Sequence, residues 1–214
     1  MAEPEKTEVR RTRAPGDQSR TRIVEQAARL ATIEGLDGLS IGRLAEVTGV
    51  AKSSVHALFG SKEQLQLATI DAARESFIAD VVTPALAAAD PGRARLEALC
   101  DGYLDYVEQR IFPGGCFFVA VSAEVGARPG RVHDEVARVQ AQWRDLLESE
   151  ARTAGERGEL SEGCDPPQLA FELGVILAGT NIVSVLHDDD RPIARARLAV
   201  RDRLAPRGRT GPTS

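Results

Sequence analysis

The residues whose types and spacing could do chemistry are small, polar and basic side chains in the first third of the chain. They are Lys52, Ser53, Ser54, His56, Ala57 and Lys62. Small side chains let a backbone come close to base edges, and Lys and Ser donate hydrogen bonds to phosphates or to acceptors in a DNA major groove. Further candidates in the same region are Arg22, Ser40 and Arg43. These residue types predict an interface for double-stranded DNA.

Two short helices and a tight turn must position these side chains. The stretch Ser40–Leu65 reads SIGRLAEVTGVAKSSVHALFGSKEQL. Ser40 is a good N-cap for a first helix, and Gly49 ends that helix because glycine tolerates the left-handed conformation of a sharp reversal. Val50 fills the corner, and a second short helix follows at 52–58. This pattern is typical of a helix-turn-helix, although a helical corner in any all-α domain gives a similar one.

The wider segment Ser19–Leu65 resembles the DNA-binding domain of the TetR family of transcriptional regulators. The matching parts are a first helix at Thr21–Ile33, a link at Gly35 and Leu39-Ser40, the pair Leu44-Ala45, the turn Gly49-Val50 and the run Ser61-Lys62-Glu63-Gln64-Leu65. The chain departs from the family pattern at Ala51, where Ser or Thr is usual, and at His56, where a Tyr that touches phosphate is usual. Ala57 and Leu58 replace bulkier groups. The resemblance therefore gives the fold but not the operator sequence.

The resemblance implies a homodimeric regulator, most often a repressor, that binds a near-palindromic operator through two copies of residues 40–59. It also implies that a small-molecule inducer binds the C-terminal body and spreads the two DNA-reading ends. The segment Ile111–Cys116, Ile-Phe-Pro-Gly-Gly-Cys, looks like that of one common TetR subfamily. These similarities name neither the ligand nor the regulated genes.

The charge distribution agrees with a DNA-binding end on an acidic body. The 214 residues carry a formal net charge of −5. Between Val9 and Lys62, nine basic residues stand against five acidic ones, so this span carries about +4. An Arg-rich tail without a role in binding would give a similar excess, so the charge alone does not decide.

Hydrophobic periodicity and turn signals predict an all-α protein of about nine helices. We expect a disordered basic arm over residues 1–18, a helix-turn-helix domain over 19–64, a ligand-binding and dimerisation domain over 65–205, and a disordered tail over 206–214. Within the arm, Arg10, Arg11 and Arg13 would either enter a minor groove or stay solvated. After the two short helices, further helices are predicted at about 61–82, 93–111, 116–127, 131–157, 167–186 and 192–204, with Thr83-Pro84 ending or kinking the first.

A ligand cavity is expected in the C-terminal body, because pockets between bundle helices are apolar with a few polar anchors. The candidate lining residues are Phe77, Tyr103, Tyr106, Phe117, Val121, Trp143 and Asn181. Each of them could equally be ordinary core. Tyr103, Trp143 and Asn181 stand out because each needs a polar partner when it is buried. We predict an apolar or aromatic small molecule as the inducer.

The run Leu169–Leu186 is apolar nearly all round, so a single chain cannot bury all of it. A second copy related by a two-fold axis would cover the rest. The predicted dimer contacts are Leu173, Ile176, Thr180 and Val183. Polar residues interrupt the run, so a bundle helix is favoured over a membrane span, and no membrane partner is expected.

No constellation of residues predicts catalysis, a cofactor or a metal site. The three histidines, His56, His133 and His187, are widely separated, and no glycine-rich phosphate loop follows a strand. We therefore expect a protein that is not an enzyme. The rival hypothesis is a small-molecule-binding helical protein or enzyme whose helix-turn-helix is only structural.

The three cysteines, Cys100, Cys116 and Cys164, form no paired motif. Without a signal peptide, this usage indicates the reducing cytoplasm. Cys116 follows Gly114-Gly115 and is either a thiol activated at a helix N-terminus or a small buried residue beside Phe117.

Overall fold

The structure is a computed structural model that describes residues 15–206. Over this range it contains ten α-helices and one π-helical segment, with no strand, which confirms the all-α class. The elements are α1 (Pro15–Glu34), α2 (Ile41–Thr48), α3 (Lys52–Phe59), α4 (Lys62–Phe77), η1 (Ile78–Val82), α5 (Thr83–Ala88), α6 (Arg93–Glu108), α7 (Phe117–Val125), α8 (Arg131–Glu156), α9 (Pro166–His187) and α10 (Arg191–Leu204).

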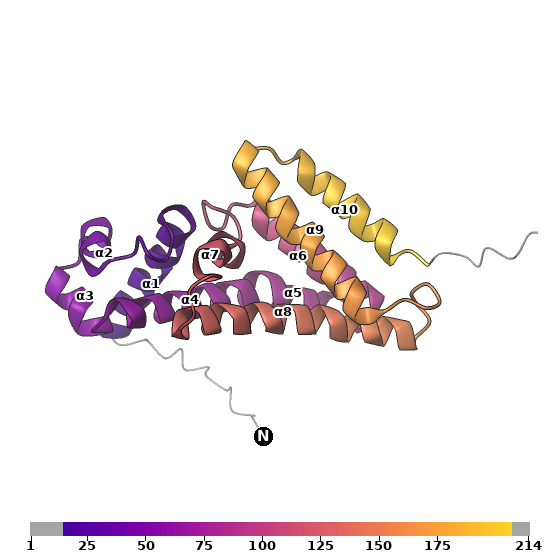
Figure 1. Ribbon diagram of the computed structural model, residues 1–214, viewed down its shortest axis with the longest axis horizontal. Coiled ribbons are helices and arrows are strands. Elements are labelled where there is room, and N and C mark those ends of the chain that lie inside the picture. Colours follow the sequence, from indigo (N-terminus) through magenta and orange to yellow (C-terminus); the bar gives the residue numbers. More distant parts are fainter. Residues whose placement is uncertain (1–14, 207–214) are drawn as a thin grey trace, which may run out of the picture.

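The first three helices form a compact unit, which we call the head (Pro15–Phe59), at one end of the molecule (Figure 1). The Ser40 hydroxyl caps α2 by accepting a hydrogen bond from the Arg43 amide at 3.1 Å. Gly49 ends α2 with a φ of 68°, the left-handed conformation predicted for the turn. Val50 is half-buried against the core, as expected for a residue that fills the corner.

The helix after the head continues further than the sequence predicts. It was expected to end or kink at Thr83-Pro84, but helical backbone continues from Lys62 to Ala88 through the π-helical turn η1. Pro84 has no amide hydrogen to donate, and the Thr83 amide just before it bonds to the Ile78 carbonyl five residues back. The π turn thus accommodates the proline, and α5 is the element that the prediction of about nine helices lacks.

The remaining helices form the body, with α8 along one side and α9 and α10 crossing its far half (Figure 1). α8 packs against α9, α6, α4 and α7, and α10 packs on α9 and α6. α7 lies between the head and the body, because it contacts α1 on one side and α8 and α9 on the other. One continuous apolar core runs through both units.

α1 extends back to Pro15, six residues before the first helix expected at Thr21–Ile33. The arginines of the predicted basic arm, Arg10, Arg11 and Arg13, lie outside the described residues, as does most of the predicted C-terminal tail.

Replacing glycine by alanine should have opposite effects on stability at Gly49, in the turn after α2, and at Gly155, inside α8. Gly49→Ala places a side chain in a left-handed conformation with no neighbour within 4 Å, so backbone strain alone should lower the free energy of unfolding, by about 1–2 kcal/mol. Gly155→Ala, in the regular helix α8 with equally open surroundings, should raise it by up to about 1 kcal/mol. Chemical denaturation of the two variants checks this, and an unchanged or higher stability for Gly49→Ala would contradict the assigned turn.

Candidate nucleic-acid interface and ligand cavity

α3 presents one buried and one exposed face. Val55 and Phe59, four residues apart, are buried with 0% and 5% exposure. The outward side chains are those predicted to contact DNA: Lys52, Ser53, Ser54, His56 and Ala57. The structure therefore brings these five residues together on one accessible face with small side chains at its centre.

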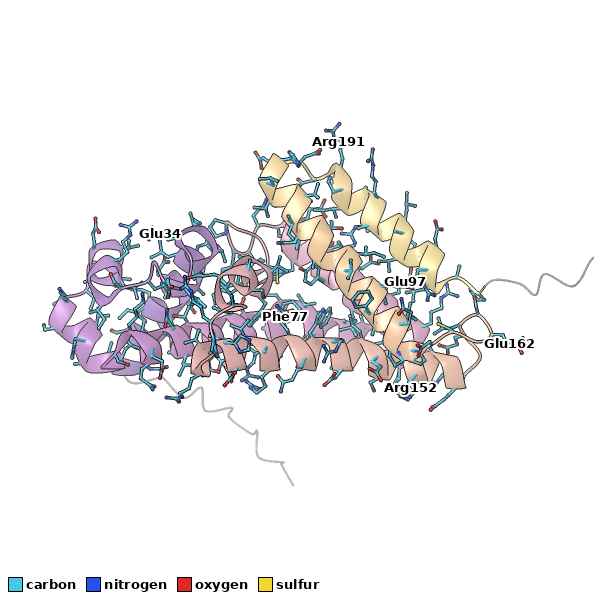
Figure 2. All side chains as sticks on the ribbon, viewed as in Figure 1. Glu34, Phe77, Glu97, Arg152, Glu162 and Arg191 are labelled. Atoms are coloured by element: carbon cyan, nitrogen blue, oxygen red, sulfur yellow. The ribbon has the colours of Figure 1, made fainter. Side chains whose placement is uncertain are left out.

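Three other predicted DNA contacts are engaged inside the head. Arg43 forms ion pairs with Glu34 at 2.7 Å and Glu46 at 3.1 Å, and its hydrogen bond holds the pKa of the Glu34 carboxyl below its usual value. Figure 2 shows Glu34 within the head. Arg22 donates to the Thr48 carbonyl at 3.3 Å, and Ser40 is the α2 cap described above. These contacts explain the three residue types without DNA, so their predicted role is not needed to account for them.

Lys62 also has a partner within the protein. Its Nζ donates to the Asp37 carbonyl at 2.6 Å and lies 3.8 Å from the Asp37 carboxylate. Asp37 pairs in addition with Arg128, which precedes α8. Lys62 thus ties the start of α4 to the segment Gly35–Leu39 between α1 and α2, which we call the link, and a DNA phosphate would have to replace this acceptor.

Glu124 of α7 holds the link from the opposite side. Its carboxylate accepts hydrogen bonds from the amides of Leu36 at 2.8 Å and Asp37 at 2.6 Å. The buried Gln66 side chain donates to the Leu36 carbonyl at 2.9 Å. The polar groups of the link are therefore bonded to α4 and α7, so the position of the head depends on both helices.

The loop before α7 is fixed to the head and to α9. Arg29 of α1 donates to the Ile111 carbonyl at 2.8 Å, and the Gly114 amide donates to Thr32 Oγ1 at 3.1 Å. The Cys116 amide donates to Asn181 Oδ1 at 2.7 Å. Asn181, predicted as a ligand contact, is instead 2% exposed and uses its amide oxygen to hold the start of α7.

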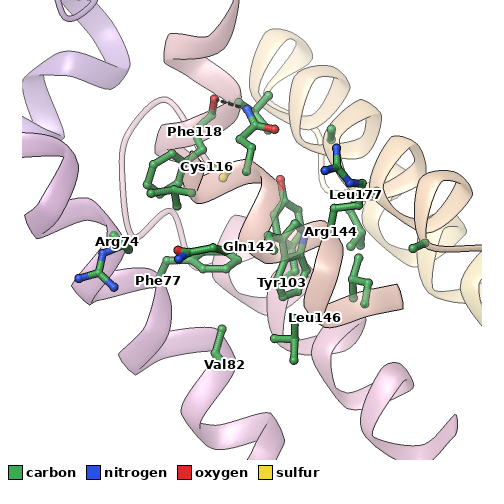
Figure 3. Close-up of a pocket in the computed structure, with 18 of the residues that line it drawn as sticks. Arg74, Phe77, Val82, Tyr103, Cys116, Phe118, Gln142, Arg144, Leu146 and Leu177 are labelled. Atoms are coloured by element: carbon green, nitrogen blue, oxygen red, sulfur yellow. Dashed lines mark hydrogen bonds between the residues drawn. The ribbon is translucent and has the colours of Figure 1, made fainter. Parts of the chain in front are cut away.

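A cavity of about 460 Å³ lies between α4, α6, α7, α8 and α9 (Figure 3). Three predicted residues line it: Phe77, Tyr103 and Trp143. Their rings are packed together, with the Phe77 centroid 5.1 Å from Trp143 and 6.1 Å from Tyr103, both edge-on. The prediction that an apolar cavity with aromatic walls lies in the body agrees with this geometry.

Four predicted ligand residues do not line the cavity. Tyr106, Phe117, Val121 and Asn181 are buried in the core around it. The cavity is also lined by residues that were not predicted from the sequence, among them Cys116, Phe118, Val119, Phe171 and Val175. α7 and α9 are apolar on nearly every face, so the sequence carries no signal for which face points to the cavity.

Cys116 lines the cavity as a buried residue. It is 3% exposed, and burial raises the pKa of its thiol. A higher pKa disfavours the thiolate, which is the reactive form. Of the two interpretations left open by the sequence, the geometry supports the small buried side chain.

One face of α9 remains exposed and apolar. Phe171, Val175, Ile182 and Leu186 are between 53% and 74% exposed, and Leu198 of α10 is 59% exposed. Leu173 and Thr180, predicted as dimer contacts, are instead buried in their own chain at 0% and 9% exposure. This part of the dimer prediction is wrong, because α9 turns the side that carries Asn181 inward. Of the other two predicted dimer contacts, Val183 is exposed and Ile176 is partly buried.

Within the described residues, α9 is also the one helix long and apolar enough to cross a membrane by length and composition. About 33% of that apolar window is buried, and the helix packs against α8, α10 and α6. No group of His, Cys, Asp and Glu in the same part of the chain is placed to hold a metal ion.

Two family models match the chain. One, of bacterial regulatory proteins of the tetR family, matches residues 23–69, which contain the helix-turn-helix. The other, the tetracyclin repressor-like C-terminal domain, matches residues 92–200, more than half of the 214 residues. No curated protein matches the chain.

Solved structures share the whole fold. A TetR transcriptional regulator from Chloroflexus aurantiacus superposes with a TM-score of 0.79 at 26% identity, over 86% of this chain and 93% of that one. A TetR family regulator from Cytophaga hutchinsonii gives 0.77 at 19% identity, over 91% and 96%. AibR, in complex with isovaleryl coenzyme A and operator DNA, gives 0.68 at 22% identity, over 88% and 100%.

The fold, the exposed α3 face and the matched models define a transcriptional regulator of the helix-turn-helix class. The chain belongs to the TetR family. Members of this family are non-enzymatic DNA-binding transcription factors, so the prediction that the protein is not an enzyme is confirmed. This membership does not support the rival hypothesis of a small-molecule-binding helical protein or enzyme whose helix-turn-helix is only structural.

The contact between Glu124 and the link predicts that Glu124→Ala loosens the head. Two amides would lose a charged acceptor, so the free energy of unfolding should fall by about 1–3 kcal/mol, and hydrogen exchange at the Leu36 and Asp37 amides should become faster. Glu148→Ala, which breaks only the exposed pair with Arg152, is the matched control and should change stability by less than about 0.5 kcal/mol. Equal exchange rates in both variants would contradict the assigned contact.

Proposed function

We propose that the protein is a ligand-responsive repressor that binds a near-palindromic operator as a homodimer. The observation that carries the proposal is the exposed face of α3, which offers small and basic side chains while its other face is locked in the core of the head. A repressor of this kind would act in the cytoplasm, where the bacterial chromosome lies.

The chemistry of the α3 face supports reading of a major groove. Ser53, Ser54 and Ala57 are short enough to let the helix backbone approach base edges, and the two hydroxyls can donate or accept hydrogen bonds there. Lys52 at the start of the helix and His56 one turn later are suited to phosphates. The same face on a second copy would meet the next half-site, about 34–36 Å away.

The exposed apolar face of α9 supports the homodimer. Phe171, Val175, Ile182 and Leu186 follow one another at helical spacing and form one stripe. An apolar stripe of this size is rarely left to water, and a two-fold partner would cover it with its own copy. The dimer contacts we propose are therefore these residues with Val183 and Leu198, in place of Leu173 and Thr180.

α7 supports control by a ligand, because it contacts both the cavity and the head. Cys116, Phe118 and Val119 at its start line the cavity, and Glu124 near its end holds the link. A ligand that shifts α7 would therefore shift the head. By linkage, a ligand that weakens operator binding must itself bind more weakly to the DNA-bound protein by the same factor.

Lys52→Ala tests the DNA contact. Loss of one phosphate contact should weaken binding to all DNA sequences similarly and reduce the slope of log affinity against log salt by about one. The control is Arg152→Ala, which removes the same charge at the far end of the body (Figure 2) and should leave the slope unchanged. Operator affinity measured over a salt titration decides, and an unchanged slope for Lys52→Ala would remove α3 from the interface.

Ile182→Asp tests the dimer. A carboxylate buried without a partner at an apolar interface is strongly unfavourable, so this variant should be a monomer by light scattering at micromolar concentration. Val47→Asp is the matched control, because Val47 is 41% exposed on α2 in the head, whereas Ile182 is 53% exposed within the α9 stripe. A wild-type monomer, or a dimer of Ile182→Asp, would contradict the proposed interface.

A further inference from the structure

A buried hydroxyl group in the cavity wall has no hydrogen-bond partner in the part of the chain that the structure describes. Among the described residues, two cavity-lining atoms have no hydrogen-bond partner, Arg74 Nε and the Tyr103 hydroxyl. Arg74 is half-buried at the edge, and Figure 3 shows its guanidinium directed away from Phe77 and Tyr103. Tyr103 is only 3% exposed. Its hydroxyl is therefore the polar atom for which the occupant of the cavity must provide a partner.

The surroundings of Tyr103 define what that partner is. Burial, together with the neighbouring Cys116 thiol, raises the pKa of Tyr103 well above its usual value, so the phenol remains a donor. Cys116 lies close to the hydroxyl, but the geometry of a hydrogen bond is not met. The ring of Tyr103 stacks on Trp143 with centroids 6.2 Å apart. The hydroxyl thus needs an acceptor from a flat or apolar molecule that lies against these rings.

Two cations, Arg74 and Arg144, line the cavity. Arg144 is 3.7 Å from Asp145. The guanidinium of Arg74 points away from Phe77 and Tyr103 (Figure 3). The side chain of Gln140, which also lines the cavity, donates hydrogen bonds to the Phe118 carbonyl at 3.4 Å and to Ser122. A carboxylate placed beside Tyr103 would therefore be buried with the Arg74 guanidinium directed away from it, which is unfavourable.

We propose that the cavity binds a neutral, largely apolar ring compound whose carbonyl-type oxygen accepts a hydrogen bond from Tyr103. This names the ligand class of the proposed regulator and so rests on that function for its biological meaning. The cavity walls are mainly apolar and aromatic, and a site built to bond one oxygen discriminates against the same molecule without it.

The test compares 9-fluorenone, fluorene and fluorene-9-carboxylate, which share one ring system and differ in the group offered to Tyr103. Their affinities for the full-length chain are measured by equilibrium dialysis without DNA. We expect fluorenone to bind about tenfold more tightly than fluorene, because fluorene leaves the hydroxyl unpaired, and the carboxylate to bind more weakly than the ketone. In Tyr103→Phe the preference for the ketone should disappear.

The control variant is Tyr106→Phe. Tyr106 is as buried as Tyr103 and its ring lies 5.7 Å from Phe77, but it does not line the cavity. The tenfold preference should survive this change. Equal binding of ketone and hydrocarbon by the wild type, a preference retained in Tyr103→Phe, tighter binding of the carboxylate, or binding of none of the three would overturn the proposal. Loss of operator binding in a separate DNA assay would overturn the repressor function and leave the ketone preference standing.

Discussion

The arrangement of head and body depends on how closely the backbone of residues 112–116 approaches two helices. A Cβ atom on Gly114 would lie 2.1 Å from the Thr32 carbonyl oxygen in α1, and one on Gly115 would lie 2.1 Å from Asn181 Oδ1 in α9. Neither distance is possible between non-bonded atoms, so only glycine fits at both positions. The two glycines let the loop bond to α1 on one side and to α9 on the other. α7 therefore starts from a point that belongs to the head and to the body at once.

From this fixed start, α7 is long enough, at nine residues, to connect the cavity with the link. Its first turn forms a wall of the cavity, and Glu124 in its last turn bonds the link. A hydrogen bond to a charged acceptor contributes about 1.5–3 kcal/mol, which is the size of a typical coupling free energy between two sites, about 1–3 kcal/mol. If a ligand controls DNA binding as proposed, a change at the Glu124 contacts alone would be large enough to couple the two sites, without a large rearrangement of the bundle.

The helix-turn-helix was predictable because its signals are local. Ser40 caps α2 with its own side chain, and Gly49 has the left-handed φ that its position in the turn demands. The cavity and the exposed face of α9 were not predictable in detail, because successive residues of a helix point about 100° apart and both α7 and α9 are apolar all round. Phe118 lines the cavity while Phe117 does not, and Ile182 is exposed while Leu173 is buried. Contacts between residues distant in sequence set these orientations, such as the hydrogen bond between Asn181 and the Cys116 amide.

Several basic side chains near the DNA-binding face are bonded to groups of the protein itself, and this affects how the protein would distinguish DNA sequences. Within the head, Arg22 is bonded to the Thr48 carbonyl, and Arg43 forms ion pairs with Glu34 and Glu46. At the start of α4, Lys62 is bonded to Asp37. Lys52 and His56 are the basic groups left on the exposed face of α3. Each phosphate contact adds affinity for every DNA sequence alike, so the fewer cations the α3 face offers, the smaller is its non-specific contribution to DNA binding. In the proposed dimer, discrimination would then depend on short side chains at base edges and on the fixed spacing of the two heads. Movement of α7 would change that spacing.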